Sequence, residues 1–299
     1  MPAFSTHYLF AEEMMNTLKD IADFEINENA VLIGTQGPDI FFFHRAFPWQ
    51  PGKPLRKLGS SLHREKAGIL LNKLYNYCKK TESGIAKSYA FGFILHYALD
   101  RSCHPYVYYI QNKITQRHPE FNPHSAHNII ELSLDSLMLS LHLNIKSPVL
   151  FETEKTIKAT ENELNEISKE IAFLADITGE EAKTAILDMK NMQQLLLDKN
   201  GKKKRITARL EKIASPFTKN FLLSAYFRTN DLEKAKKYAN IYNEKWKSPF
   251  SELTSRKSFF DLYEDAKSDA KNLLVKWQSG ADGEKITNNL SFLTGVEVK

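Results

Sequence analysis

The sequence predicts an all-α fold, a multi-helix globular bundle with further helices in its C-terminal part, and three observations lead to that fold class. Apolar residues recur every three or four positions through most of the 299 residues, as one buried stripe on each helix requires. The segment 34–60 is so rich in glycine and proline that we expect it to interrupt regular structure. We find neither an internal repeat nor a succession of strand-like segments.

The elements follow from this pattern in chain order. A first helix is predicted over 6–21, where Leu9, Met15 and Leu18 recur at helical spacing. The segment 34–60 then carries an aromatic run made of Phe41, Phe42, Phe43, Phe47 and Trp49. Helical patterns resume over 61–80, 86–103, 123–144, 153–176, 179–198, 203–225, 230–246 and 257–278.

Composition indicates an ordinary globular protein. No apolar run reaches the ~18 to 20 residues that a membrane span needs, and the first residues lack the pattern of a secretory signal, so we expect a cytoplasmic protein. Cys78 and Cys103 are too few for a disulfide framework, which agrees with a reducing compartment. The net charge of +5 favours anionic ligands but is far below that of a dedicated nucleic-acid binder.

Histidine is distributed unevenly along the chain. All nine histidines lie at or before position 142. If they act together, the chemistry belongs to the first half of the chain. We therefore expect residues 1–150 to form the metal-binding catalytic region and residues 151–299 to form helices that pack on it as one all-α unit.

The segment FGFILHYALDRSCHPYV, residues 91–107, places ionisable side chains in an apolar helix. His96 and Asp100 are four residues apart, so they lie on one helix face and could hold one metal ion. Pro105 disfavours helical geometry at His104, so we expect the helix to end there. One buried histidine is more often a hydrogen-bonded core residue, but burying two with a carboxylate is costly without a ligand.

A second pair of this kind occurs in NPHSAHNIIELSLD. Asn122 and Pro123 suit the start of a helix. His127, Glu131 and Asp135 then share one face of that helix. A buried histidine paired with a glutamate is the alternative without metal, but two helices with such pairs favour a metal site.

Five motifs occur in order over roughly residues 5–145: THYLF, QGPD, Leu62-His63, HYALDRSCHP and HNIIE. In this order they resemble the zinc-dependent phospholipases C of bacteria and their relatives, the single-strand-specific zinc nucleases. The resemblance implies an all-α enzyme with two or three zinc ions.

The ligands that the resemblance implies are all imidazoles or carboxylates. Zinc prefers these donors where it keeps a position open for water or substrate. The resemblance assigns them to three ions: Asp39, His63, His96 and Asp100 to the first, Asp100 and His7 to the second, and His104, His127 and Glu131 to the third.

The remaining histidines are expected outside the metal site. His44 competes with His63 for one ligand role, and we favour His63 because SSLHREK begins a helix that can hold it rigidly. His118, His124 and His142 are expected at the surface or in packing, and Asp135 could orient a ligand.

Phosphodiester hydrolysis is the reaction that such a cluster would perform. Paired zinc ions can bind both non-bridging oxygens of a phosphodiester and activate a water. We expect Asp39 to act as zinc ligand and general base. A phospholipid is one candidate substrate and nucleic acid a less favoured one; a non-catalytic helical zinc protein is the third alternative. The oligomeric state is not predicted.

Two further segments have no assigned function. The basic run GKKKR at 201–205 could touch acidic lipid or nucleic acid, although such a run is usually a solvated turn. The amphipathic helix expected at 231–246 could bind a partner, but packing on its own domain is the simpler expectation.

Overall fold

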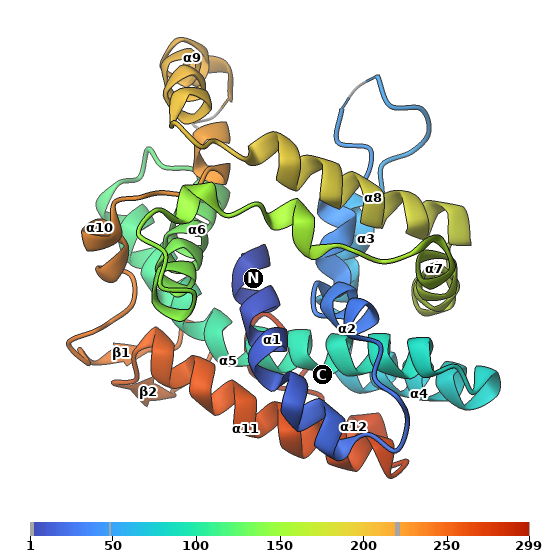
Figure 1. Cartoon of the computed structure of the whole chain (residues 1–299). Coiled ribbons are helices and arrows are strands. Elements are labelled where there is room, and N and C mark those ends of the chain that lie inside the picture. Colours follow the sequence, from blue (N-terminus) through green and yellow to red (C-terminus); the bar gives the residue numbers. More distant parts are fainter. Residues whose placement is uncertain (1–2, 48, 219–221, 299) are drawn as a thin grey trace.

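The computed structural model describes residues 3–47, 49–218 and 222–298. Helices make up most of this part of the chain, and its one sheet has only two short strands, so the predicted all-α fold class is confirmed (Figure 1). The α-helices are α1 Phe4–Ile21, α2 Glu28–Gly34, α3 Arg56–Leu62, α4 Ala67–Thr81, α5 Gly84–Arg117, α6 Pro123–His142, α7 Glu161–Ala175, α8 Gly179–Leu196, α9 Lys202–Thr218, α10 Leu232–Lys236, α11 Phe259–Gln278 and α12 Gly283–Thr287.

Shorter elements connect these helices. The 3-10 helices are η1 Gly37–Phe43, η2 Pro148–Leu150, η3 Thr153–Thr156 and η4 Leu223–Tyr226. The strands β1 (Trp246–Lys247) and β2 (Thr254–Ser255) form an antiparallel pair in which Trp246 lies opposite Ser255. Among the described helices, none has the length and apolar character needed to cross a bilayer.

Helix α5 runs through the middle of the molecule and packs most extensively against α2 and α11 (Figure 1). Its crossing with α2 depends on two glycines. A Cβ added at Gly92 would lie 2.2 Å from the carbonyl oxygen of Val31, and one added at Gly34 would lie 2.2 Å from that of Tyr89. Side chains at these positions would push the two backbones apart, so the glycines bring η1, which follows α2, close to α5.

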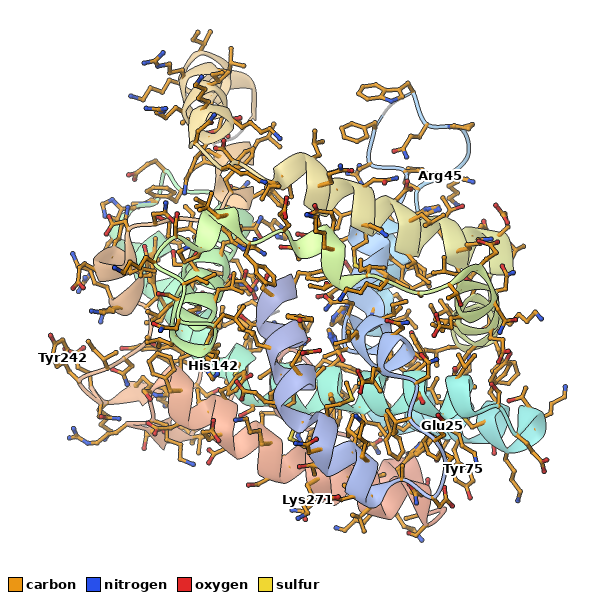
Figure 2. The ribbon with its side chains drawn as sticks, viewed as in Figure 1. Glu25, Arg45, Tyr75, His142, Tyr242 and Lys271 are labelled. Atoms are coloured by element: carbon orange, nitrogen blue, oxygen red, sulfur yellow. The ribbon has the colours of Figure 1, made fainter. Side chains whose placement is uncertain are left out.

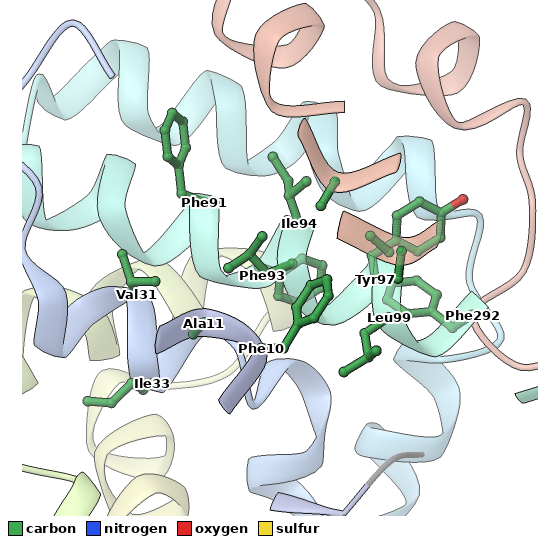
Figure 3. Packing of buried hydrophobic residues seen from close by; sticks show 14 of the residues in the cluster. Phe10, Ala11, Val31, Ile33, Phe91, Phe93, Ile94, Tyr97, Leu99 and Phe292 are labelled. Atoms are coloured by element: carbon green, nitrogen blue, oxygen red, sulfur yellow. The ribbon is translucent and has the colours of Figure 1, made fainter. Parts of the chain in front are cut away.

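The hydrophobic core contains residues from the whole described chain. Phe10 of α1, Phe93 and Tyr97 of α5 and Phe292 near the C-terminal end are all buried (Figure 3). The rings of Tyr97 and Phe292 meet edge to face, with centroids 4.8 Å apart. Each buried side chain of this size contributes roughly 1.5–3 kcal/mol to folding, so the segment around Phe292 is held firmly on α5.

Helix α1 lies between α6 and α11 and is tied to both. The Glu13 carboxylate pairs with His142 of α6, which is labelled in Figure 2. It also pairs with the Lys267 ammonium of α11 at 2.6 Å. The expectation that His142 is a packing residue agrees with this position. The ion pairs fix the rotation of α1 and therefore the direction in which its first turn points.

The predicted helix end at His104 is wrong. Helix α5 continues through Pro105 to Arg117. Proline inside a helix removes a hydrogen bond and costs roughly 3 kcal/mol. Tyr106 and Val107, which follow it, are buried, and the Tyr106 hydroxyl donates to the carbonyl oxygen of Tyr238 at 2.8 Å. This packing offsets the cost, so His104 stays on the same helix as Asp100.

The helix predicted over 230–246 is also wrong. Only α10 (Leu232–Lys236) forms there, and Asn240 and Asn243 have left-handed φ angles of 51° and 53°. The Asn240 side chain donates to nearby backbone carbonyls, including that of Glu244 at 3.0 Å. These local bonds replace the helical ones, as asparagine often allows. Trp246 consequently enters β1 and is buried.

Other boundaries differ by less. The segment 34–60 is not wholly irregular, because η1 and the start of α3 lie within it. The helix predicted from 153 begins at Glu161, where Thr160 and Glu163 form a capping box. The helix predicted over 203–225 ends at Thr218, and residues 219–221 lie outside the described part of the chain.

Candidate metal centre

Three groups of donor atoms that could hold a metal ion occur among the described residues. Within each group the donor atoms lie within 4.8 Å of one another. The groups are His7, His96 and Asp100; Asp39, His63 and His96; and His104, His127 and Glu131. All eight residues suggested by the sequence therefore lie in these groups, and the first two groups share His96.

The Asp100 carboxylate lies at the centre of the first two groups. Its Oδ1 is 3.3 Å from His7 Nε2, and its Oδ2 is 3.2 Å from His96 Nε2 and 3.6 Å from His63 Nε2. Asp39 Oδ1 lies 3.1 Å from His63 Nε2 on the other side. The side chains come from α1, η1, α5 and the residue that follows α3, so four separate elements converge on this point.

Backbone carbonyls fix how the histidine rings face. A carbonyl oxygen can only accept a hydrogen bond, so each Nδ1 described below carries a proton and each Nε2 presents its lone pair to the group. The Nδ1–H donors and their acceptors are His63 to Gly59 at 2.7 Å, His96 to Thr35 at 3.1 Å and His104 to Phe292 at 2.8 Å. The three rings are thus held in the tautomer that a metal ion requires.

The QGPD turn places Asp39 beside the His96 ring. Gly37 has a φ angle of +49°, and a Cβ at this position would lie 2.5 Å from the ring carbon Cδ2 of His96. Both the left-handed conformation and the close approach exclude a larger residue. Asp39 follows in the first turn of η1 and is buried.

The third group is built by α5 and α6. His127 Nε2 lies 2.9 Å from Glu131 Oε1, one helical turn away, and His104 Nε2 lies 3.8 Å from the same oxygen. The other ring nitrogen of His127 donates to Gln111 Oε1 at 2.8 Å. Because α5 continues past Pro105, His104 and Gln111 belong to the same helix.

The buried polar atoms of the first two groups fit a cation. Both Asp100 oxygens, Asp39 Oδ1 and His7 Nε2 are buried without a hydrogen-bond partner in the described part of the chain, although they lie close to one another. Leaving such atoms unpaired costs about 1–3 kcal/mol each, and more for a charged group. A divalent metal ion would satisfy all of them, and imidazole with carboxylate is a donor set that suits zinc.

The protonation states agree with metal binding. Burial lowers the pKa of His7 to about 4, and burial also lowers the pKa of His63 and that of His104. Burial by itself would raise the pKa of Asp100, but the neighbouring His96 and His104 hold it well below its usual range. Burial thus favours the neutral form of His7, His63 and His104, and the ionised form of Asp100 is favoured by its neighbours; these are the forms that bind a metal ion.

Asp39 differs from Asp100 in its electrostatic surroundings. Burial raises its pKa well above the usual value, although the neighbouring His96 acts in the opposite direction. A carboxyl group with a raised pKa can accept a proton near neutral pH.

A cavity of about 720 Å³ opens beside the donor groups. Asp39 and His63 of one donor group line it together with His127 and Glu131 of another. The rest of its wall mixes basic and apolar side chains, among them Arg56, Arg64, Phe42, Phe43, Leu132, Met189 and Leu196. A ligand in this cavity would contact two of the three donor groups.

The other histidines lie outside the groups. His44 Nδ1 accepts a hydrogen bond from the Leu55 N–H at 3.1 Å, so its lone pair is already used, and the geometry favours His63 over His44 as the ligand. His118 is exposed beside Glu120, and His124 is exposed at the cavity wall.

Asp135 positions α1 rather than a histidine ring. It accepts hydrogen bonds from the Thr6 N–H at 2.7 Å and from Arg228 Nε at 2.9 Å. Because Thr6 precedes His7, these bonds hold the first turn of α1 at the site. Arg228 and Phe292 could not be identified from the sequence, since a lone arginine and a backbone carbonyl in the C-terminal half carry no recognisable motif.

Comparison with known proteins identifies one family. The family model described as zinc dependent phospholipase C matches residues 6–178, more than half of the chain. The matched region contains all three donor groups. No curated protein and no solved structure matches the chain.

Proposed function

Because this chain belongs to the zinc-dependent phospholipase C family, we propose that it is a hydrolase that cleaves a phosphodiester bond with a zinc-activated water. The observation that carries this proposal is the cavity, which is lined by residues of two donor groups. A purely structural zinc site is closed by its protein ligands, whereas a catalytic one keeps a position open for water or substrate.

We assign the eight residues of the three groups as ligands of two or three zinc ions. Asp39, His63, His96 and Asp100 would hold one ion, His7 and Asp100 a second, and His104, His127 and Glu131 a third. Bound zinc would neutralise charge on the phosphate and lower the pKa of a water molecule.

Asp39 is the proposed general base. Its carboxylate lies at the edge of the buried group and also lines the cavity, so it can contact both the metal site and a molecule bound there. It would orient the attacking water and take its proton.

The cavity wall favours a phospholipid over a nucleic acid. Phe43, Leu132, Met189 and Leu196 provide aliphatic and aromatic surface that could accept the glycerol and the beginning of an acyl chain. Arg56 and Arg64 provide positive charge for the phosphate. The cytoplasmic location and the division at residue 150 stay predictions.

The test combines metal analysis with hydrolysis. Purified protein should contain at least two zinc ions per chain, consistent with the three groups, and should hydrolyse an aryl phosphodiester. His118→Ala, which changes an exposed histidine outside the groups, should leave both results unchanged. Less than one zinc per chain, with unchanged melting after chelation, would contradict the proposal.

A second assay separates the substrates. Activity should rise on short-chain phosphatidylcholine near its micelle concentration, whereas single-stranded DNA should remain intact. The reverse result would select the nuclease, and zinc without activity on either substrate would select a structural role.

A further inference from the structure

Helix α9 carries an apolar strip on its solvent-facing side. Ile206, Leu210 and Ile213 are 56%, 60% and 76% exposed. Their spacing of four and three residues places them on one face of the helix. Isolated apolar residues on a surface are common, but three in register on one helix form a continuous strip.

The opposite face of α9 attaches it to the body through polar groups. Lys204 Nζ donates to the carbonyl oxygens of Phe227 and Arg228 at 3.2 and 3.3 Å. Glu211, which is buried, accepts from the Ser224 N–H and hydroxyl, both at 2.6 Å. An amphipathic helix normally buries its apolar face, whereas α9 turns its apolar face to solvent and its polar face to the body of the protein.

Helix α9 projects from the body of the molecule, and a loop forms a second projection on the same side. The loop between η1 and α3 rises beside α8, and α9 rises near the other end of that helix (Figure 1). Figure 2 shows Arg45 at the base of this loop. Trp49 in the loop is 76% exposed, and its ring stacks on that of Phe47 with centroids 4.7 Å apart.

Helix α8 holds both projections in place. The Asp188 carboxylate accepts from the backbone N–H of Arg45 at 2.7 Å and from the Gln50 side chain at 3.0 Å. At the far end of α8, Lys203 Nζ donates to the carbonyl oxygen of Leu195 at 2.7 Å. The loop, α8 and α9 therefore form one supported face, which we call the α8–α9 face.

The charge of this face is positive. Helix α9 contains Lys202, Lys203, Lys204, Arg205, Arg209 and Lys212, whereas its one acidic residue, Glu211, is buried against Ser224. Arg209 neighbours the apolar strip, because it lies four residues before Ile213. Aliphatic side chains flanked by basic ones, with an exposed tryptophan in the second projection, are the features of a surface that binds the interface of a lipid bilayer.

We propose that the α8–α9 face docks this protein on the surface of a membrane that contains anionic lipid. The apolar strip and Trp49 enter the boundary between head groups and acyl chains, and the basic residues contact lipid phosphates. A nucleic-acid site would offer stacking aromatics and not an aliphatic strip, so lipid is the better partner. The proposal does not depend on the proposed hydrolase activity.

Binding to vesicles tests the proposal with the whole 299-residue chain, purified in the presence of zinc. The protein should sediment with vesicles of phosphatidylcholine and about 30% phosphatidylglycerol, and bind phosphatidylcholine alone more weakly. The triple variant Ile206→Ser, Leu210→Ser and Ile213→Ser should lower binding by at least about tenfold. Arg209→Glu alone should lower it by at least about fivefold at low salt.

Matched variants on α11 control for general changes of surface. Val275→Ser and Lys271→Glu alter an exposed apolar and an exposed basic residue of α11, which lies on the side of the molecule away from α9 (Figure 1) and carries Lys271 as labelled in Figure 2. Binding should not change. Thermal melting and zinc content should match wild type in all variants. Equal binding of the α9 and α11 variants would overturn the proposal, and so would absence of vesicle binding by the wild type.

Tryptophan fluorescence locates the contact independently. The chain has three tryptophans, and Trp246 and Trp277 are buried. Emission should shift to the blue immediately after anionic vesicles are added, and Trp49→Phe should abolish the shift. If the α9 substitutions instead abolished self-association or binding to single-stranded DNA, without vesicle binding by the wild type, membrane docking would be wrong.

Discussion

Asp100 and Glu170 are both completely buried carboxyl groups, but their surroundings are opposite. Asp100 of α5 is surrounded by imidazoles, with ring nitrogens of His7 and His96 within 3.3 Å of its oxygens. Glu170 of α7 receives a weak hydrogen bond from the Cys78 thiol at 3.6 Å, and no cation pairs with it among the described residues. Burial therefore raises the pKa of Glu170 well above its usual range, whereas the pKa of Asp100 is lowered.

This difference shows that burial alone does not mark a metal ligand. A buried carboxyl group without basic neighbours becomes neutral and behaves as a polar core residue. One that lies among several basic imidazoles stays ionised, and a bound metal ion would balance its charge. The regions around Asp100 and Glu170 should therefore respond differently to metal removal and to pH. They should also respond differently when a carboxylate side chain is replaced by the corresponding amide.

The largest effect is expected for Asp39→Asn in the metal region. The amide keeps the shape of the side chain but cannot take a proton, so turnover should fall by about 100- to 10,000-fold, the usual value of general-base assistance. Zinc content should stay near that of wild type, because the amide keeps one oxygen and the proposed ion keeps its three other ligands, His63, His96 and Asp100. Rate and metal content are measured on the same samples. A wild-type rate with full zinc would remove Asp39 from the mechanism.

Removal of the metal should destabilise the protein nearly as strongly. If zinc is present at about 1,000 times its dissociation constant, it stabilises the folded state by roughly 4 kcal/mol, and chelation removes that contribution. Denaturant titration with and without chelator measures the change. Glu170→Gln should show the same loss as wild type, because Glu170 lies outside the donor groups. Equal stability with and without zinc would mean that the region around Asp100 does not need a metal ion, and its contrast with Glu170 would fail.

Glu131→Gln and His127→Ala should act through the metal first. Even the loss of a group that only supports a ligand costs about 10- to 100-fold in metal affinity, and these residues are proposed as direct ligands. Zinc at the third group should therefore be lost, with activity falling as a consequence. Metal analysis after dialysis against a weak chelator distinguishes this from the Asp39 variant. Full zinc with reduced activity would place Glu131 in the chemical step instead.

The smallest effect is expected for Glu170→Gln, and it depends on pH. The pKa of Glu170 is raised in the folded protein, so the folded state holds a proton that the unfolded state releases above pH ~4.3. Wild-type stability should consequently fall as pH rises from there toward the folded pKa, by up to about 1.4 kcal/mol per pH unit. The glutamine variant should lack this slope. Urea titrations at several pH values compare the two.

A matched control keeps that experiment interpretable. Glu264→Gln changes an exposed glutamate on α11 and should retain the wild-type dependence of the free energy of unfolding on pH. Identical slopes in wild type and Glu170→Gln would mean that Glu170 is ionised in the folded protein, and the contrast with Asp100 would fail.

Much of the fold and of the candidate site could be predicted from the sequence, because both depend on helical spacing. His96 with Asp100, and His127 with Glu131, are each four residues apart, and that spacing alone places each pair on one face. The all-α fold follows from the same period. Asp39 and His63 needed the ordered motifs, since no local spacing relates them to α5.

The remaining features depend on tertiary packing. The continuation of α5 through Pro105 depends on the burial of Tyr106, which the residue before a proline does not indicate. The carbonyl groups of Thr35 and Phe292 orient His96 and His104, but a backbone carbonyl has no sequence signature. Arg228 reaches Asp135 from a segment without a recognisable pattern.

The hydrogen bond from His104 to the Phe292 carbonyl joins residues 188 positions apart in the chain. At the usual speed of translation, about 5–20 residues per second, roughly 10–40 s pass between synthesis of the histidine and synthesis of its acceptor. During that interval neither the tautomer nor the rotation of the His104 ring is fixed by this bond. The nascent chain therefore lacks this support for the candidate metal cluster until residue 292 has been made, and zinc captured earlier would meet a His104 ring that this bond does not yet hold.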